Sequence, residues 1–157
     1  MLHKVWFVVI GLCLISSSAN GKDYFGFNFE TDVRTVAIEK LDDFWIDYQQ
    51  QPKQLRFIRS GMLRLLASYL QQGTLTFDAQ DRLISIEVVA EYTDDTVQRL
   101  VKHFNEDYDF DQTEQPLRVS WFTAGTQWQQ RDPRGMQWRF AITTQDIRIR
   151  VSPGADH

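Results

Sequence analysis

Alternating and helically spaced apolar positions divide the first part of the chain into a strand and a helix. Every second residue of 24–29 is a phenylalanine, as in a half-buried strand. Apolar residues then recur at three- and four-residue spacing over 32–49, after a potential N-cap at Thr31, which predicts an amphipathic helix. This helix is expected to end before Pro52, because the residue that precedes a proline avoids the helical region.

The segment 54–72 allows two interpretations. Leu55–Ile58 has the composition of a short strand, whereas the polar residues between positions 62 and 72 fall on one helical stripe that ends before Gly73. A glycine at that point favours a mostly buried helix with a C-terminal cap. A hairpin that turns at Ser60 and Gly61 fits the same residues, so the conformation of this segment stays open.

The middle of the chain predicts a hairpin followed by a second helix. Residues 74–77 and 83–91 resemble two strands around a turn at 78–81, because each strand is apolar and the turn is polar. Residues 94–105 begin with two aspartates and carry an apolar stripe, which is typical of an amphipathic helix. In the second strand we expect these side chains to face inward: Ile84, Ile86, Val88 and Ala90.

The last third of the chain predicts a four-stranded antiparallel meander. Its turns are marked by Ala124-Gly125, by Asp132-Pro133-Arg134-Gly135 and by positions 144–145. An Asp-Pro-x-Gly turn suits a three-residue loop that closes with a left-handed glycine. The expected strands are 117–123, 126–131, 136–142 and 146–151.

These turns fix a register that can be compared with the apolar pattern. They place apolar side chains opposite one another in three pairs: Trp121 with Trp128, Trp128 with Phe140, and Phe140 with Ile149. A shift by one residue would move every side chain to the other face of the sheet. The overall expectation is an α+β fold, with an antiparallel sheet that ends in a four-stranded meander and two or three helices packed on one face.

Residues 1–21 have the three parts of a secretory signal peptide. A basic start with Lys4 precedes an eleven-residue apolar run and then a stretch of small residues, and this run is too short for a spanning helix of about 20 residues. Small residues allow cleavage after Ala19 or after Gly21. Cys13 lies inside the apolar run after a leucine, so we expect no lipid attachment. Residues 22–157 would then form a single domain in the periplasm or outside the cell, without stable membrane insertion.

The charge of the chain is unevenly distributed. The 157 residues carry a net charge of −4, which argues against a general nucleic-acid binder. Residues 22–116 contain 10 basic and 18 acidic side chains, whereas residues 117–157 contain six basic and three acidic ones. The acidic and the basic excess therefore lie in different parts of the domain.

The predicted register gathers arginines on the face of the meander opposite the apolar rows. Arg118 is expected opposite Arg131, and Arg139 opposite Arg150, with Arg148 on the same face. Like charges directly across a ladder repel, so we expect the acidic region to fold back and pair with these arginines, or the arginines to be solvated. The alternative is a protein partner with an acidic patch, since arginine suits bidentate recognition of carboxylates.

Motifs for catalysis or metal binding are missing from the sequence. There is no thiolate or histidine pair at metal-ligand spacing, no nucleophile elbow and no phosphate-binding loop, so no metal and no cofactor is expected. The acidic run Asp107-x-Asp109-x-Asp111 begins like a calcium loop but lacks the later glycine and glutamate. His103 is the one histidine available for a hydrolase that we would not recognise from sequence.

The stretch TLTFDAQDRLISI over Thr74–Ile86, followed by a helix and a tryptophan-bearing meander, resembles small exported bacterial domains. These domains are β-lactamase-inhibitor-like modules and small envelope-assembly proteins. The resemblance implies a non-catalytic binding protein of inhibitor, immunity or accessory type. Two alternatives stay open: a glycan-binding envelope protein in which Trp45 or Phe122 stacks on sugar, and an unrecognised hydrolase.

Overall fold

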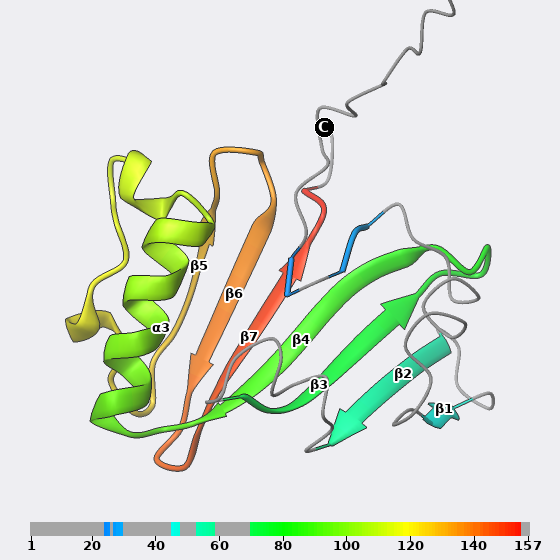
Figure 1. The fold of residues 1–157 in the computed structure, drawn as a ribbon, viewed down its shortest axis with the longest axis horizontal. Helices are drawn as coiled ribbons and strands as arrows, with labels where there is room; N and C mark the ends of the chain where they lie inside the picture. Colours follow the sequence, from blue (N-terminus) through cyan, green and yellow to red (C-terminus); the bar gives the residue numbers. More distant parts are fainter. Residues whose placement is uncertain (1–23, 26, 30–44, 48–52, 59–69, 155–157) are drawn as a thin grey trace, which may run out of the picture.

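An antiparallel sheet of seven strands dominates the computed structural model, which describes residues 24–25, 27–29, 45–47, 53–58 and 70–154 (Figure 1). The predicted signal peptide lies outside these residues. In spatial order the strands run β1-β2-β3-β4-β7-β6-β5. Their bounds are β1 Trp45–Asp47, β2 Lys53–Ile58, β3 Leu70–Phe77, β4 Leu83–Glu91, β5 Gln127–Arg131, β6 Gln137–Ile142 and β7 Asp146–Ser152.

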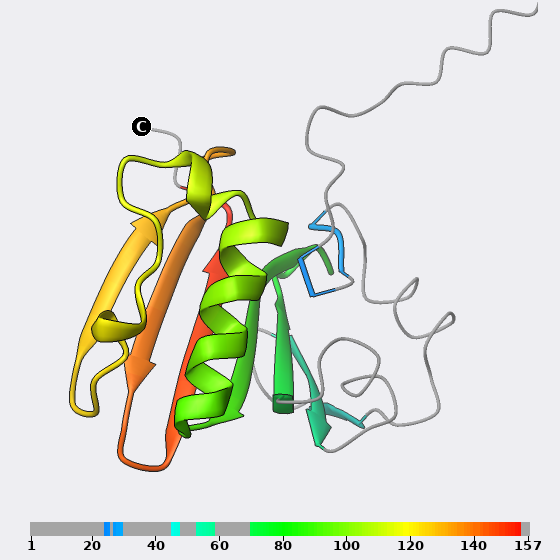
Figure 2. The ribbon, with the colours of Figure 1, turned by 60° about the vertical axis from the view of Figure 1, so that its left-hand side comes forward.

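One α-helix, α3 (Asp94–Asp107), connects β4 with the C-terminal strands, and it confirms the helix expected at 94–105. The Thr93 side chain accepts a hydrogen bond from the backbone N–H of Thr96, 3.1 Å away, and so caps the first turn. The helix lies across one face of the sheet, over β5–β7 (Figures 1 and 2). Its predicted apolar stripe is buried there: Val97, Leu100, Val101 and Phe104.

Aromatic side chains fill the space between α3 and the sheet. Trp138 of β6 is fully buried, and its ring contacts those of Phe104 and Tyr108 at centroid distances of 5.3 and 4.9 Å. Phe140 stacks on Trp128 of β5 at 3.9 Å. Stacked and tilted contacts between aromatic rings add to the free energy gained by burial. These aromatic residues form the part of the core that lies on the α3 side of β5–β7.

The last three predicted strands are confirmed, including their register. Trp128 is opposite Phe140, and Phe140 is opposite Ile149. Gly135 closes the β5–β6 turn with a φ of 82°, as the Asp-Pro-x-Gly signal predicts. The sheet order could not be derived from these turns, because β7 continues the sheet by pairing with β4.

The first strand of the predicted meander is wrong, because Val119–Trp121 forms a 3₁₀ turn, η3. Leu117 and Phe122 are both buried, although an odd spacing would place them on opposite faces of a strand. The side chain of Asn105 binds both the backbone N–H and the carbonyl of Leu117, which holds this segment against α3. The meander therefore has three strands. Trp121 still contacts Trp128, at a centroid distance of 5.4 Å, but not as a ladder pair.

The predicted strand at 24–29 is also wrong. Tyr24 and Phe27 form an isolated bridge with backbone hydrogen bonds of 2.8 and 2.9 Å, so the chain folds back on itself. Phe25 has a φ of 52°, in the left-handed region, which an extended strand excludes. Tyr24, Phe25 and Phe27 are all buried. The tight turn lets consecutive aromatic residues enter the core together, which strand alternation would prevent.

The hairpin β3–β4 confirms the strands predicted at 74–77 and 83–91, but the predicted orientation of one side chain is wrong. Ile84 was expected to face inward, but 38% of it is exposed, whereas Leu83 is buried. A register shift between Thr76 and Phe77 causes this difference. It brings Leu83 opposite Phe77, and an irregularity of this kind reverses the facing of the residues beyond it.

The remaining predictions for the N-terminal half have mixed outcomes. Residues 45–47 form strand β1 beside β2, so the predicted helix 32–49 is wrong at its end; residues 32–44 and 48–49 lie outside the described residues. The short strand Leu55–Ile58 is confirmed within β2. Gly73 lies inside β3 and caps no helix. Antiparallel pairing of β2 with β3 agrees with the hairpin alternative, although the turn proposed at Ser60 and Gly61 is not among the described residues.

Candidate functional site

The face of the sheet opposite α3 carries a polar row from β5 to β2. One row of directly opposed residues crosses six strands from β5 to β2: Gln129, Arg139, Arg150, Glu87, Thr74 and Arg56. Arg148 lies two residues from Arg150 on the same face of β7. We call Arg56, Arg139, Arg148 and Arg150 the arginine face; all four are exposed.

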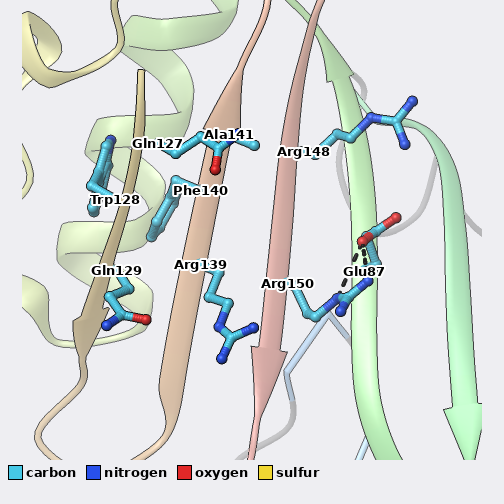
Figure 3. A pocket seen from close by; sticks show the side chains of 9 residues that line it. All are labelled: Glu87, Gln127, Trp128, Gln129, Arg139, Phe140, Ala141, Arg148 and Arg150. Carbon is cyan, nitrogen blue, oxygen red and sulfur yellow. Dashed lines mark hydrogen bonds and ion pairs between the residues drawn. The ribbon is translucent and has the colours of Figure 1, made fainter. Parts of the chain in front are cut away.

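Two neighbouring hollows lie on this face. The first, of about 460 Å³, extends over β5, β6 and β7 and is lined by Arg139, Arg148 and Arg150 together with glutamines of β5 (Figure 3). The second, of about 370 Å³, continues over β2 and β3 and includes Arg56. Glu87, Arg148 and Arg150 line both hollows, so the two form one trough across the strands.

The charges of the trough are only partly paired. Arg150 binds the Oε2 atom of Glu87 through Nε at 3.2 Å and Nη2 at 2.9 Å. Arg148 lies 3.6 Å from the carboxylate of Asp146. Among the described residues, the Arg139 side chain has no hydrogen bond and no ion pair, and it stands directly opposite Arg150. Within the described part of the chain, Arg139 is therefore a cation without a partner, and it lies beside a second cation.

The structure brings together three of the five arginines that the sequence singled out: Arg139, Arg148 and Arg150. Arg131 has the facing of Arg139 by register, but it lines neither hollow. The predicted pairing of Arg118 with Arg131 is wrong. Arg118 precedes η3 and has no strand partner, because residues 117–123 do not form a strand.

Sequence reasoning missed Arg56 as a member of this face. Its signal was present, since Arg56 follows buried Leu55 in a short strand, and alternation turns it away from the core. What the sequence did not reveal is that β2 belongs to the same sheet as β7, with β3 and β4 between them.

The aromatic residues considered for sugar stacking do not form such a site in the described part of the chain. Phe122 is only 3% exposed, and its carbonyl accepts a hydrogen bond from the Tyr92 hydroxyl at 2.9 Å. The expectation that Phe122 stacks on a glycan is therefore wrong. The side chain of Trp45 is outside what the structure describes.

His103 and the acidic run 107–111 do not converge with the trough. The Nδ1 atom of His103 is 2.6 Å from a carboxylate oxygen of Asp107, one helical turn away. Asp109 instead binds Arg134 at 2.9 Å. Among the described residues, no group of three or more histidine, cysteine, aspartate or glutamate side chains could hold a metal ion.

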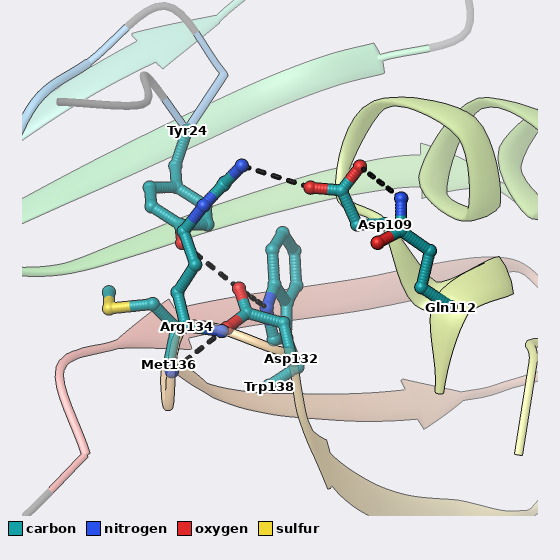
Figure 4. A network of polar contacts seen from close by, with 7 residues as sticks. All are labelled: Tyr24, Asp109, Gln112, Asp132, Arg134, Met136 and Trp138. Atoms are coloured by element: carbon teal, nitrogen blue, oxygen red, sulfur yellow. Dashed lines mark hydrogen bonds and ion pairs between the residues drawn. The ribbon is translucent and has the colours of Figure 1, made fainter. Parts of the chain in front are cut away.

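A second polar cluster surrounds the buried carboxylate of Asp132 (Figure 4). Its Oδ2 atom accepts hydrogen bonds from the Tyr24 hydroxyl at 3.0 Å and from Nε1 of Trp138 at 3.1 Å. Its Oδ1 atom accepts from the backbone N–H groups of Arg134 and Met136 at 2.9 and 3.0 Å. These four bonds satisfy the carboxylate, so the cluster has a structural role: it ties residue 24 to the β5–β6 turn.

The Tyr24 hydroxyl is strongly perturbed by this environment. Burial, together with the negative charge of Asp132, raises the pKa of Tyr24 to about 12, against a lowering influence of Arg134. The hydroxyl is therefore a hydrogen-bond donor at neutral pH and not a base.

Comparison of the chain with known families, with curated proteins and with solved structures found no match. Among the described residues, α3 is the longest helix, and no helix has the length and apolar character needed to cross a bilayer.

Proposed function

We propose that this protein is an exported, non-catalytic binding protein of inhibitor, immunity or accessory type. Its arginine face binds an acidic patch on another envelope or secreted protein. The observation that carries this proposal is Arg139: an exposed cation without a partner among the described residues, directly opposite Arg150.

The electrostatics of the trough favour an anionic partner. Four arginines and one glutamate line the two hollows, so the trough has an excess of positive charge in a domain that is acidic overall. Guanidinium groups form paired hydrogen bonds with carboxylates. A carboxylate placed between Arg139 and Arg150 would relieve their mutual repulsion, which gives binding a favourable contribution that the free protein lacks.

Export is proposed from the leader-like residues 1–21 alone. A short basic start, an apolar run and small residues before the cleavage site are the features that secretion uses. The mature chain is then expected to begin at Asn20 or Lys22. Mass spectrometry of the protein purified from a periplasmic fraction would measure this; a full-length mass in that fraction would contradict cleavage.

The binding proposal is tested by reversing the charge of Arg139. Arg139→Glu is compared with the wild type by pull-down from an envelope extract, followed by affinity measurement on the recovered protein. Arg118→Glu is the matched control, because it makes the same charge change at an exposed arginine that lines neither hollow. We expect Arg139→Glu to lose the partner and Arg118→Glu to retain it.

Salt gives a second measurement on the same complex. An interface dominated by exposed charges weakens as ionic strength rises, because the screening length falls from about 10 Å at 0.1 M to about 3 Å at 1 M. Equal retention by both variants, or a complex insensitive to salt, would contradict the proposal. Recovery of a glycan in place of a protein would favour the polymer-binding alternative.

A further inference from the structure

Strand β5 forms one edge of the sheet, since β6 is the only strand of the described residues that pairs with it. The backbone N–H of Ile142 donates to the carbonyl of Thr126, and that of Asp132 donates to the carbonyl of Met136. Antiparallel ladders alternate between hydrogen-bonded and non-bonded pairs. Gln127, Gln129 and Arg131 therefore direct their backbone N–H and carbonyl groups away from β6, toward the free edge.

A hollow of about 440 Å³ follows this edge. Its lining includes Gln127 and Gln129, whose side chains lie on the arginine face, and Trp128, whose side chain lies on the α3 side. Because both faces of β5 contribute, the hollow runs along the edge of the strand. Trp121 forms part of its wall on the α3 side.

From these observations we propose that β5 is a docking edge for an extended peptide segment of another protein, which adds to the sheet as an antiparallel eighth strand. This inference rests on the proposed function, because it names how the acidic partner binds. Main-chain hydrogen bonds would supply affinity, and alternate side chains would supply specificity.

Charge determines which segment fits. In an antiparallel pair, the residues opposite Gln127, Gln129 and Arg131 project from the arginine face. Arg131 is exposed and has no ion pair among the described residues, and Arg139 follows on the next strand. Acidic side chains suit these positions. The alternate positions face Trp121 and Trp128 and suit apolar side chains. A second copy of β5 would instead offer no carboxylate to Arg131 and Arg139, because the strand carries no acidic residue.

The probe is a capped heptapeptide of alternating valine and glutamate, measured by calorimetry and by amide hydrogen exchange. We expect it to bind and to slow exchange at Gln127, Gln129 and Arg131. A peptide with lysine in place of glutamate is expected not to bind. In the antiparallel register, a glutamate of the peptide lies opposite Gln129. Its backbone amide then points toward β5, and its side chain lies on the same face of the sheet as the arginines. N-methylation of the glutamate amides should therefore abolish binding, whereas N-methylation of the valine amides should not.

On the protein side, Gln129→Pro removes the edge donor without removing a β5–β6 hydrogen bond, and edge strands tolerate proline. Gln129→Ala is the matched control, because it removes the side chain and keeps the amide. We expect the proline variant to weaken binding about tenfold or more, and alanine to change it less than about twofold. Thermal denaturation of both variants checks the fold.

The inference would be overturned by no binding of the glutamate peptide, by binding to Gln129→Pro as tight as to the wild type, or by loss of binding with valine methylation in place of glutamate methylation. A dimer of the free protein that Gln129→Pro dissociates would make the second copy the occupant and would also overturn it. If Gln129→Pro binds the natural partner normally while Arg139→Glu does not, the proposed function stands and the docking edge fails.

Discussion

Replacing Asp132 by asparagine isolates the hydrogen bonds that tie Tyr24 to the β5–β6 turn. The change keeps the size of the side chain but substitutes an amide nitrogen for one carboxylate oxygen. In one orientation this nitrogen faces Nε1 of Trp138, which is a donor. In the other it faces the backbone N–H groups of Arg134 and Met136, which are also donors. Neither orientation restores all the bonds.

The magnitude follows from the groups left without a partner. A buried hydrogen bond to a charged group contributes about 1.5–3 kcal/mol, and an unpaired buried donor costs about 1–3 kcal/mol. The Tyr24 hydroxyl can rotate and accept a hydrogen bond from the new amide. One hydrogen bond is therefore lost completely, and the remaining ones no longer have a charged acceptor. We expect Asp132→Asn to lower the free energy of unfolding by about 2–3 kcal/mol, a large share of the roughly 5–15 kcal/mol of a typical domain.

Urea denaturation followed by circular dichroism measures this change. Asp111→Asn is the matched control, since Asp111 is exposed and has no side-chain hydrogen bond or ion pair among the described residues. Its midpoint should equal that of the wild type, with the same dependence on urea. A loss below about 0.5 kcal/mol for Asp132→Asn, within the range of ordinary surface substitutions, would refute the reasoning that the carboxylate holds this cluster together.

Three further predictions concern alkaline stability, strand facing and one turn. The pKa of Tyr24 is raised by folding, so its contribution is complete below the unfolded value near 10 and is lost as the pH rises toward about 12; unfolding midpoints over this range should fall less in Tyr24→Phe than in the wild type, and equal falls would contradict the assignment. Ile86→Ala should cost about 2–5 kcal/mol because Ile86 is buried, whereas Ile84→Ala should cost at most about 0.5 kcal/mol; equal losses by urea denaturation would contradict the register shift in the β3–β4 hairpin. Gly135→Ala should cost about 1–2 kcal/mol through backbone strain alone, because φ is 82° and no atom lies within 4 Å of the added carbon; an unchanged unfolding midpoint would contradict this.

Local signals in the sequence were sufficient for elements whose neighbours along the chain are also their neighbours in space. The β5–β6–β7 register follows from turn residues and alternation, because each strand pairs with the next. The apolar stripe of α3 follows from helical periodicity for a similar reason. The α+β class and the antiparallel sheet were therefore predictable.

Elements shaped by distant contacts were not predictable in this way. Residues 24–29 alternate perfectly, yet the aromatic pocket formed with Phe104, Tyr108 and Trp138 favours a tight turn. Val119–Trp121 also follows a strand pattern, but the buried Leu117 beside Asn105 redirects the chain. In each case tertiary packing determined the backbone conformation, and local propensity did not.

The residues of the candidate site were predictable under the same condition, namely that their strands are neighbours along the chain. Arg139, Arg148 and Arg150 were predicted together because they lie on consecutive strands. Arg56 was missed, since its place depends on the β4–β7 pairing, and Arg118 was wrongly included because its strand does not exist. The Glu87–Arg150 ion pair depends on the same pairing, so the sequence predicted that the acidic region would pair with this face but did not identify Glu87 as the residue that does so.

The bond between Tyr24 and Asp132 joins residues 108 positions apart, and β4 pairs with β7, from which it is separated in the sequence by α3, β5 and β6. Neither contact can form before its distant partner has been synthesised, so folding should be slow. For a protein exported as proposed, late folding is an advantage. A chain that folds late would still be unfolded when it reaches the export machinery, which is the state that such export would require.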